Sequence, residues 1–521
     1  MTENAHATYD VAILGTGIAA SMLGAALARN GAKVILIGAD SHPKFATGES
    51  TIPHALVALR TIAERYHVPE IKTLTTFTNT TRIIGPSFGI NKHSGFLAHR
   101  PGQSQNPRET NQFSTPGLLH EASHLFRQDS DAYLFYAAAR YGCQTRQNFR
   151  VTGVDFDESG ATLSGGRPGS EEQYRARYVV DASGFRSPLA AKFGLREEPC
   201  RFKHHSRSMW NHMIGVVPTD QLFRHGDLPP VPWYQGTVHH TFERGSFWVI
   251  PFDNDKRSHN PMCSVGLTLD PRRYPKDPAV QPEDEFAAVA ARYPDIARQY
   301  AGAKPMREWV STDRLQYSSS RTVGDRWCLL GPAAGFIDSL FSRDLSNTAE
   351  TVNALVWRLL RAIRDDDFSA ERFEYIERQQ QGLLNYNDEL VNAAFISFSH
   401  YDLWTAVFRI WAWESSAGTF RLQQALSAFL KDGRDEHFRD LEEAPNLGFY
   451  WPDHDGYAKL FNEMVAQCAA FESGLTGPRQ AADNLHALLA GADFVPKRFG
   501  FAERDRRFLN ATPAAGTRGS R

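Results

Sequence analysis

The chain has 521 residues, which exceeds the size at which one hydrophobic core stops growing and favours two or three structural regions. The 57 lysines and arginines nearly balance 59 aspartates and glutamates, and the formal net charge of -2 argues against nucleic acid, an anionic membrane surface or another polyanion as partner. The 5 cysteines are scattered without a CxxC pair, which indicates reduced thiols in a cytoplasmic protein rather than a disulfide framework or a metal site.

The N-terminal segment has the order strand, glycine-rich turn, helix, strand. An apolar run of strand length, a stretch with helical spacing and a second apolar run are found at Tyr9–Leu14, Ser21–Asn30 and Lys33–Ile37. The turn between the first two segments reads GTGIAA, a GxGxx(G/A) motif in the context of a dinucleotide-binding βαβ unit. This motif explains the uncharged stretch 11–28 better than a membrane helix does, so we expect no membrane span.

Each small residue of the turn has a physical role in binding a dinucleotide. Gly15 permits the tight turn, Gly17 leaves room for the pyrophosphate, and Ala20 lets the helix pack closely on the strand. The helix N-terminus presents free N–H groups and the positive end of its dipole to the phosphates. Gly38 stands where an acidic residue is expected for the ribose hydroxyls. Asp40, two residues later, either takes over that role or is a turn residue.

Later segments resemble motifs of the flavin-dependent halogenases and occur in that family's order. They are Gly48–Pro53, Ser123–Asp129, Tyr178–Ser187, Phe247–Phe252, Gly324–Gly331 and Gly335–Asp338. The resemblance extends to about residue 350, and the helical remainder is similar to the C-terminal region of halogenases that act on phenols or carrier-bound aromatics.

The resemblance implies an α/β protein with a Rossmann-type FAD-binding fold, an inserted antiparallel sheet that binds substrate, and a helical C-terminal region. We place the FAD-binding region at 1–200 together with 301–350, the substrate-binding sheet at 201–300 and the helical region at 351–510. The tail 511–521 is small and polar, and we expect it to be disordered.

The resemblance also implies FAD as cofactor, received as FADH2 from a separate flavin reductase. Glu49 and Ser50 would lie beside the flavin, with Glu49 at the mouth of a tunnel. Arg127 would hold the pyrophosphate or flank the flavin, although an arginine that starts a helix is often only solvated. Asp181 and Asp338 belong to the two further flavin-binding segments.

In that family, reduced FAD and oxygen convert chloride or bromide to hypohalous acid. The acid passes through the tunnel to a lysine beside an electron-rich aromatic substrate, and a nearby base removes a proton. The resemblance therefore implies a cytoplasmic oxidoreductase of secondary metabolism. Its substrate would be a phenolic or pyrrole-like aromatic, either a free small molecule or one bound to a carrier protein.

The lysine segment departs from the family pattern. Where the family has a GIK stretch, this chain has GINK, so an ungapped match puts Asn91 at the lysine position and Lys92 one place later. In an extended segment the two side chains face opposite sides, whereas a bulge would let Lys92 enter the site. His99 follows in the same segment. The catalytic candidates are therefore Lys92, Asn91, Glu49 and His99.

The halide-binding turn departs as well. The family places a Ser-Gly pair after Phe-Ser, and this chain has FSRDL at 341–345. Backbone amides around Ser342, Asp344 and Leu345 are the candidates for halide binding. A carboxylate at the glycine position repels an anion unless Arg343 neutralises it.

Three functions stay open at this point. The first is halogenation, the second is a monooxygenase that hydroxylates a similar substrate without halide, and the third is a catalytically silent flavin-binding scaffold. Asn91 and Asp344 favour the second, since an asparagine cannot form a chloramine. The histidines His212, His239 and His240 lie in expected strands and are more typical of core residues than of a substrate pocket.

Overall fold

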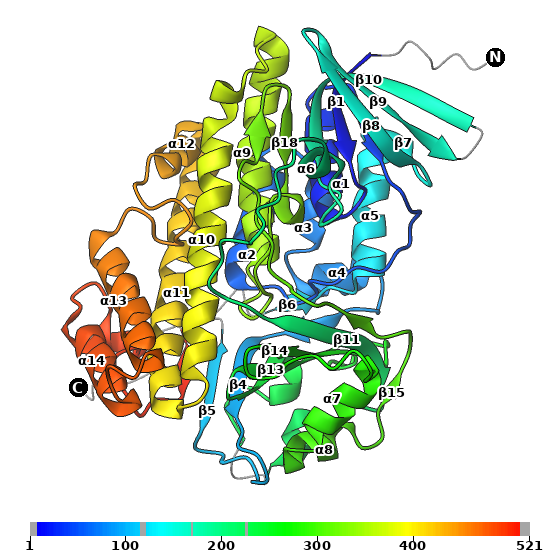
Figure 1. The fold of residues 1–521 in the computed structure, drawn as a ribbon. Coiled ribbons are helices and arrows are strands. Elements are labelled where there is room, and N and C mark those ends of the chain that lie inside the picture. Colours follow the sequence, from blue (N-terminus) through cyan, green and yellow to red (C-terminus); the bar gives the residue numbers. More distant parts are fainter. Residues whose placement is uncertain (1–7, 115–120, 168–169, 224–227, 511–521) are drawn as a thin grey trace.

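A computed structural model describes residues 8–114, 121–167, 170–223 and 228–510. The first sheet and its helices lie above a second sheet, and a bundle of long helices runs along one side of both (Figure 1). The predicted disordered tail, 511–521, lies outside the described residues.

The first sheet is the expected nucleotide-binding sheet. In sheet order its strands are β17 (Val323–Gly324), β18 (Trp327–Leu329), β10 (Ser170–Asp181), β1 (Thr8–Leu14), β2 (Val34–Ile37) and β7 (Gln144–Arg146), with β8 (Arg150–Asp157) and β9 (Gly160–Arg167) continuing from β10 as antiparallel strands. From β18 to β7 every pair is parallel. All four residues of β2 are buried, as expected for a parallel strand covered on both faces. Helix α1 (Ile18–Arg29) connects β1 and β2.

The second sheet is mainly antiparallel. In sheet order its strands are β15 (Lys304–Pro305), β11 (Arg207–Ile214), β14 (Cys263–Leu269), β13 (Gly245–Pro251), β12 (Thr237–Phe242), β4 (His93–Ala98), β5 (Thr110–Ser114) and β19 (Phe508–Asn510), and β16 (Val310–Ser311) also pairs with β11. The pairs β12–β4 and β5–β19 are parallel. The sheet therefore draws strands from both sides of the predicted region 201–300. A separate ribbon pairs β3 (Gly89–Asn91) with β6 (Ala122–His124).

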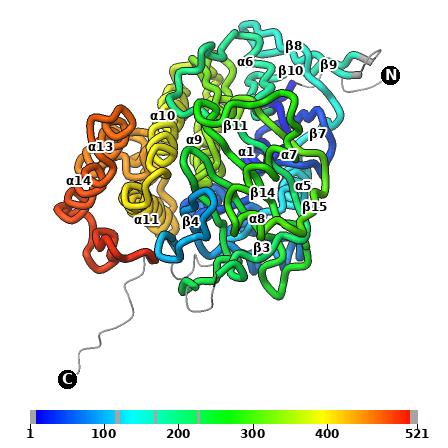
Figure 2. Tube along the Cα trace, turned by 60° about the horizontal axis from the view of Figure 1, so that its bottom comes forward, coloured from blue at the N-terminus to red at the C-terminus, as the bar shows by residue number. Residues whose placement is uncertain are grey.

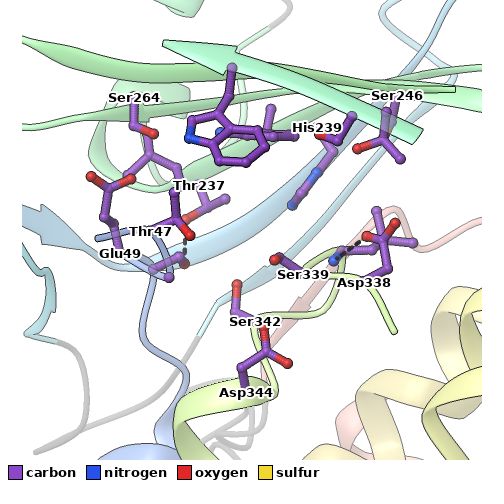
Figure 3. A pocket seen from close by; sticks show the side chains of 18 of the residues that line it. Thr47, Glu49, Thr237, His239, Ser246, Ser264, Asp338, Ser339, Ser342 and Asp344 are labelled. Atoms are coloured by element: carbon purple, nitrogen blue, oxygen red, sulfur yellow. Dashed lines mark hydrogen bonds between the residues drawn. The ribbon is translucent and has the colours of Figure 1, made fainter. Parts of the chain in front are cut away.

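Strand alternation gives the second sheet two different faces. One face carries large apolar side chains that pack with Phe286 of α7 (Pro282–Ala290) and Ile296 of α8 (Pro294–Tyr300). The other face carries serine, threonine, histidine and tryptophan side chains and looks toward the turn that carries Asp338, Ser339 and Ser342 (Figure 3). The more polar face of the sheet therefore borders a cavity.

Helices account for most of the remaining structure. The N-terminal half contributes α2 (Pro53–Arg65), α3 (Pro69–Thr73), α4 (Phe77–Ile83), α5 (Arg127–Arg140) and α6 (Pro188–Lys192). The C-terminal half contributes α9 (Asp344–Asp365), α10 (Glu374–Ser397), α11 (Tyr401–Asp432), α12 (Glu436–Glu442), α13 (Asp455–Glu472) and α14 (Pro478–Gly491). Helices α13 and α14 form the outer edge, beyond α10 and α11 (Figure 2).

Helix α9 crosses the predicted boundary at residue 350 and packs against α1 and α2. It therefore joins the flavin-binding region to the helical region. Trp404 and Trp411 of α11 are core residues, as their helical spacing predicts, and pack around Phe96. In the described part of the chain no helix is long and apolar enough to cross a membrane. The predicted fold, a Rossmann-type sheet with a substrate sheet and a helical C-terminal region, is confirmed.

Candidate active site

A groove of about 1160 Å³ runs over the carboxyl ends of β1, β2 and β10, where nucleotides bind in open α/β sheets. Gly15, Gly17, Asp40 and Arg127, four of the predicted cofactor-binding residues, line this groove. Its lining includes six basic side chains against four carboxylates, which suits a pyrophosphate; the basic residues are Lys44, Arg127, Arg150, Arg186, Lys192 and Arg196.

Two glycines explain the shape of the groove. Gly15 has φ +113°, and a Cβ there would lie 2.5 Å from the carbonyl oxygen of Ala182, so only glycine permits this close approach of the two turns. At Gly38 a Cβ would lie 2.7 Å from the Thr16 side chain. The Thr16 side chain therefore leaves no room for an acidic side chain at position 38. Asp40 is the exposed carboxylate that lines the groove near this point.

The N-terminus of α1 already contacts one carboxylate that the sequence did not reveal. Asp131 is buried, and its Oδ2 accepts a hydrogen bond from the backbone N–H of Ile18 at 3.2 Å. Arg127 neutralises it, with Nε 2.7 Å from Oδ1 and Nη2 2.9 Å from Oδ2. Arg127 also donates to the Gly48 carbonyl oxygen at 3.1 Å, so it joins α5 to the turn before Glu49. The spacing of four residues on one helix was the available signal for this pair.

The remaining predicted cofactor residues occupy different positions. Ala20 is fully buried within α1, and Asp181 lies beneath the groove, where its carboxylate accepts from Ser183, Ser187 and the N–H of Leu189. Both shape the groove without lining it. The basic lining, the glycine turn and the α1 N-terminus together fit the pyrophosphate of a dinucleotide such as FAD.

An inner cavity of about 100 Å³ adjoins the groove, between the polar face of the second sheet and the turn that precedes α9 (Figure 3). The two share six lining residues: Thr47, Gly48, Phe336, Ser339, Asp344 and Leu345. Glu49, Ser50, Asp338 and Ser342 line the cavity and do not line the groove. A flavin in the groove would therefore border the cavity across these shared residues.

The sheet side of the cavity is lined by hydroxyl groups and indoles. Its residues are Ser208, Trp210, Thr237, His239, Ser246, Trp248, Ile250, Ser264 and Thr268. Among the described residues, buried Ser208 Oγ and Trp210 Nε1 find no hydrogen-bond partner. Buried polar groups are usually paired, so these two atoms make the wall a candidate binding surface for a polar ligand. The sequence left His239 open as a core or a pocket residue and did not predict that the other residues of this wall line a cavity. The alternation of Ser246, Trp248 and Ile250 along β13 was the signal that could have identified them.

Two of the cavity carboxylates are held by neighbouring groups. Glu49 Oε1 lies 2.6 Å from His212 Nε2, and both side chains are buried. Asp338 accepts from Ser206 Oγ at 3.0 Å and from the backbone N–H of Leu340 at 2.9 Å. These contacts fix both carboxylates at the edge of the cavity.

Asn91 and Lys92 face opposite sides, as an extended segment predicts. Asn91 is buried and links two segments that border the cavity: its Nδ2 donates to the Thr51 carbonyl oxygen at 2.8 Å and its Oδ1 accepts from the Thr237 N–H at 3.2 Å. Lys92 Nζ instead donates to Gln235 Oε1 at 2.8 Å. Of the residues that the structure describes, no lysine lines the cavity.

The structure also places His99 away from the cavity. Its Nε2 lies 2.9 Å from His240 Nδ1, on the face of β12 opposite to His239, and its ring contacts Tyr293. Burial lowers the pKa of His99 well below its ordinary value. The reason is strand alternation, which puts His239 in the cavity and His240 behind the sheet.

The predicted halide turn lies at the junction of groove and cavity. Ser342 has φ +53°, a left-handed conformation that turns the chain into α9. Asp344 is the first residue of α9, and its pKa is raised to about 7 by burial and by the nearby Asp338 carboxylate. Arg343 points away, with its guanidinium 3.8 Å from the ring centre of Tyr450. Direct neutralisation of Asp344 by Arg343 is therefore not observed, and burial instead favours the neutral acid.

Comparisons with known proteins agree with this geometry. The family model described as "FAD binding domain" matches residues 8–364. The tetracycline 7-halogenase of Kitasatospora aureofaciens is 49% identical over 98% of this chain and 92% of its own length. The chain belongs to the flavin-dependent halogenases.

Two further halogenases are similar to this chain over most of their own length. The monodechloroaminopyrrolnitrin halogenase PrnC of Pseudomonas fluorescens is 46% identical over 95% of this chain and 86% of its own length. The crystal structure of halogenase PltM with phloroglucinol and FAD has a TM-score of 0.91 at 30% identity, covering 96% of this chain and 99% of that one. The protein is thus an FAD-dependent halogenase, and the monooxygenase and silent-scaffold alternatives have no support from its relatives.

Proposed function

We propose that the halogenase acts on a free aromatic small molecule that carries several hydroxyl or carbonyl oxygens. The observation that carries this proposal is the hydroxyl-lined wall of the inner cavity, with unpartnered Ser208 Oγ and Trp210 Nε1. A polar ligand would satisfy both atoms, while a purely apolar ring would leave them buried and unpaired at a cost of about 1–3 kcal/mol each.

The relatives support a free phenolic substrate over the other classes. Tetracycline and phloroglucinol, named for a 49% identical relative and for the solved PltM complex, are both oxygen-rich aromatics. A pyrrole-type compound is named for PrnC, while the relatives named for pyrrole on a peptidyl carrier protein are only 23% identical. A carrier-bound pyrrole is therefore the less favoured alternative.

Several residues would hold the cofactor. Gly15, Gly17 and the N–H groups of α1 would receive the FAD pyrophosphate, Asp40 would reach the ribose, and Arg127 would flank the flavin. Reduced flavin, once bound, would activate oxygen, and the activated oxygen would supply the oxidising equivalents that convert a halide to hypohalous acid. We further propose that a separate flavin reductase provides FADH2 and that the protein works in the cytoplasm, where its five free cysteines stay reduced.

The turn before α9 would bind the halide on its way into the cavity. Ser342 and Leu345 border the junction, and the positive end of the α9 dipole favours an anion there. Asp344 permits halide binding while its carboxyl group is protonated and opposes halide binding when that group ionises. Glu49, held by His212, would position water or hypohalous acid at the edge of the cavity.

The test is a halogenation assay with chemically reduced FAD, oxygen and bromide. Phloroglucinol and pyrrole-2-carboxylate would be supplied free, and pyrrole-2-carboxylate also as the carrier-protein thioester, with products identified by mass spectrometry. Bromination of free phloroglucinol supports the proposal. Bromination of only the carrier-bound pyrrole would overturn it, and NADH in place of reduced FAD should give no product without a reductase.

A further inference from the structure

The inner cavity needs a group that accepts the hydroxyl proton of a phenolic substrate. An electrophilic halogen attacks the ring fastest when the phenol oxygen releases its proton and its electron density flows into the ring. Three carboxylates line the cavity, and each is constrained. Glu49 is paired with His212, and Asp338 accepts two hydrogen bonds from Ser206 and Leu340. Asp344 lies at the halide turn, where burial raises its pKa to about 7 and favours the neutral acid.

His239 differs from these groups because it is a base without a partner. Its side chain extends from β12 into the cavity and points toward the turn that carries Asp338 and Ser339 (Figure 3). Only 5% of its surface is exposed, and none of the residues that the structure describes forms a hydrogen bond with its buried Nδ1. The ring is held by stacking on Phe96, with centroids 5.0 Å apart and planes at 14°.

Burial keeps the imidazole neutral and able to accept a proton. It lowers the pKa of His239 to about 4, while the Asp338 carboxylate acts in the opposite direction. A transient imidazolium would therefore form beside the Asp338 carboxylate, the one charged group among the described residues that acts appreciably on it. A stacked imidazole that extends into the cavity beside a fixed carboxylate can act as a general base, because the carboxylate offsets part of the free-energy cost that burial puts on the imidazolium.

We propose that His239 is a catalytic residue that accepts the phenolic proton of the substrate as the ring is halogenated. The phenol O–H bond breaks and an N–H bond forms at Nε2, while the ring carbon takes the halogen from hypohalous acid. The O–X bond of that acid breaks, and its electron pair leaves with hydroxide. Hydroxide removes the ring C–H proton to form water, and the imidazolium returns its proton to the product oxygen, so phenol and hypohalous acid give halophenol and water.

The role of His239 rests on the proposed function, and a substitution pair tests it. His239→Gln keeps a hydrogen-bonding group but cannot accept the proton, so kcat/KM for phloroglucinol should fall by about 100-fold or more at pH 7. His240→Gln is the matched control, because His240 is the next residue of β12, is also buried and faces away from the cavity. It should keep the wild-type rate if the protein is folded.

The pH profile separates a proton acceptor from a structural residue. In His239→Gln, kcat/KM should climb tenfold per pH unit until the phenol ionises by itself, and then approach the wild-type value. With bromide saturating at every pH, the wild-type profile should be nearly flat over the same range. A constant deficit at all pH values, or a wild-type rate in the variant, would overturn the assignment.

A second measurement needs no variant. Phloroglucinol bound to the FAD-loaded wild-type protein should protect His239 from diethyl pyrocarbonate, as mapped by mass spectrometry, and leave an exposed histidine such as His67 modified to the same extent. Equal modification of His239 with and without phloroglucinol would reject its contact with substrate. If the wild-type protein halogenates no phenol at all, the proposed function fails; if it does so and His239→Gln behaves as wild type, only this inference fails.

Discussion

Asp344 should make halide use by this enzyme strongly dependent on pH. Its carboxyl lies where the flavin groove meets the inner cavity, and its pKa is raised to about 7 by burial and by Asp338. Halide binding at this turn requires the neutral acid, since an ionised carboxylate repels the anion. Asp344→Asn removes the charge at every pH and keeps the size of the side chain.

The magnitude follows from the fraction of neutral acid. An apparent affinity is reduced by the fraction of protein in the competent state, so the KM for bromide should rise about tenfold between pH 6 and pH 8 in the wild-type protein. Asp344→Asn should have a KM that is nearly constant over this range and about tenfold lower than the wild-type value at pH 8.

Steady-state bromination of phloroglucinol, with saturating reduced FAD and variable bromide, measures both quantities. Asp455→Asn is the control, since Asp455 also begins a helix, α13, but is exposed. It should reproduce the wild-type profile. A wild-type KM for bromide that does not change between pH 6 and pH 8, or an Asp344→Asn profile that still rises, would refute the assignment of halide to this turn.

Other substitutions test the remaining parts of the site. Lys92→Met should retain most of the bromination rate, because the ammonium binds Gln235 outside the cavity; loss of activity in a folded variant would instead restore Lys92 as the catalytic lysine. Arg127→Gln leaves buried Asp131 unpaired at the α1 N-terminus, so the Kd for FAD, measured by quenching of flavin fluorescence, should rise by about tenfold or more, and adding Asp131→Asn should recover part of it. No change in Kd would contradict a role of Arg127 in FAD binding. The pKa values of His93 and His239 are lowered to about 4, and those of His124 and His240 to about 3, in each case mainly by burial. Because the unfolded chain takes up these protons first, stability should be lost as the pH falls below 6.5, by about 2 kcal/mol per histidine at pH 5. Denaturant midpoints measured from pH 7 to pH 5 that stay constant would disprove this.

The sequence located residues of the groove and of the turn before α9, but not most of the sheet wall of the cavity. Gly15 and Gly17 could be assigned because their roles depend on a local turn whose motif is contiguous. The sequence placed Asp181 in a flavin-binding segment but did not show that it lies beneath the groove instead of lining it. Its contacts with Ser183 and Ser187 depend on the path of the following turn.

The substrate half depends on which face of a strand each side chain occupies. His239 and His240 are adjacent and chemically identical in the sequence, and only the pairing of β12 decides which one enters the cavity. The same holds for Asn91 and Lys92 in and after β3. His99 shared a segment with Lys92, but its partner is His240, 141 residues away. Such long-range pairings are not encoded in any one segment.

The short strand β19 has a consequence for how this enzyme is made. Phe508–Asn510 pairs in parallel with β5 and forms one edge of the substrate sheet, and Arg409 of α11 holds the preceding segment through the carbonyl oxygens of Arg504 and Arg506. During synthesis the nucleotide-binding unit can form early, while the substrate sheet lacks its edge until residue 510 has left the ribosome. A chain that terminates before this strand would expose β5 as an unpaired edge, which is a ready template for aggregation. Aggregation or proteolysis would thus remove truncated chains that can still bind flavin and react with oxygen but lack a complete cavity to hold hypohalous acid.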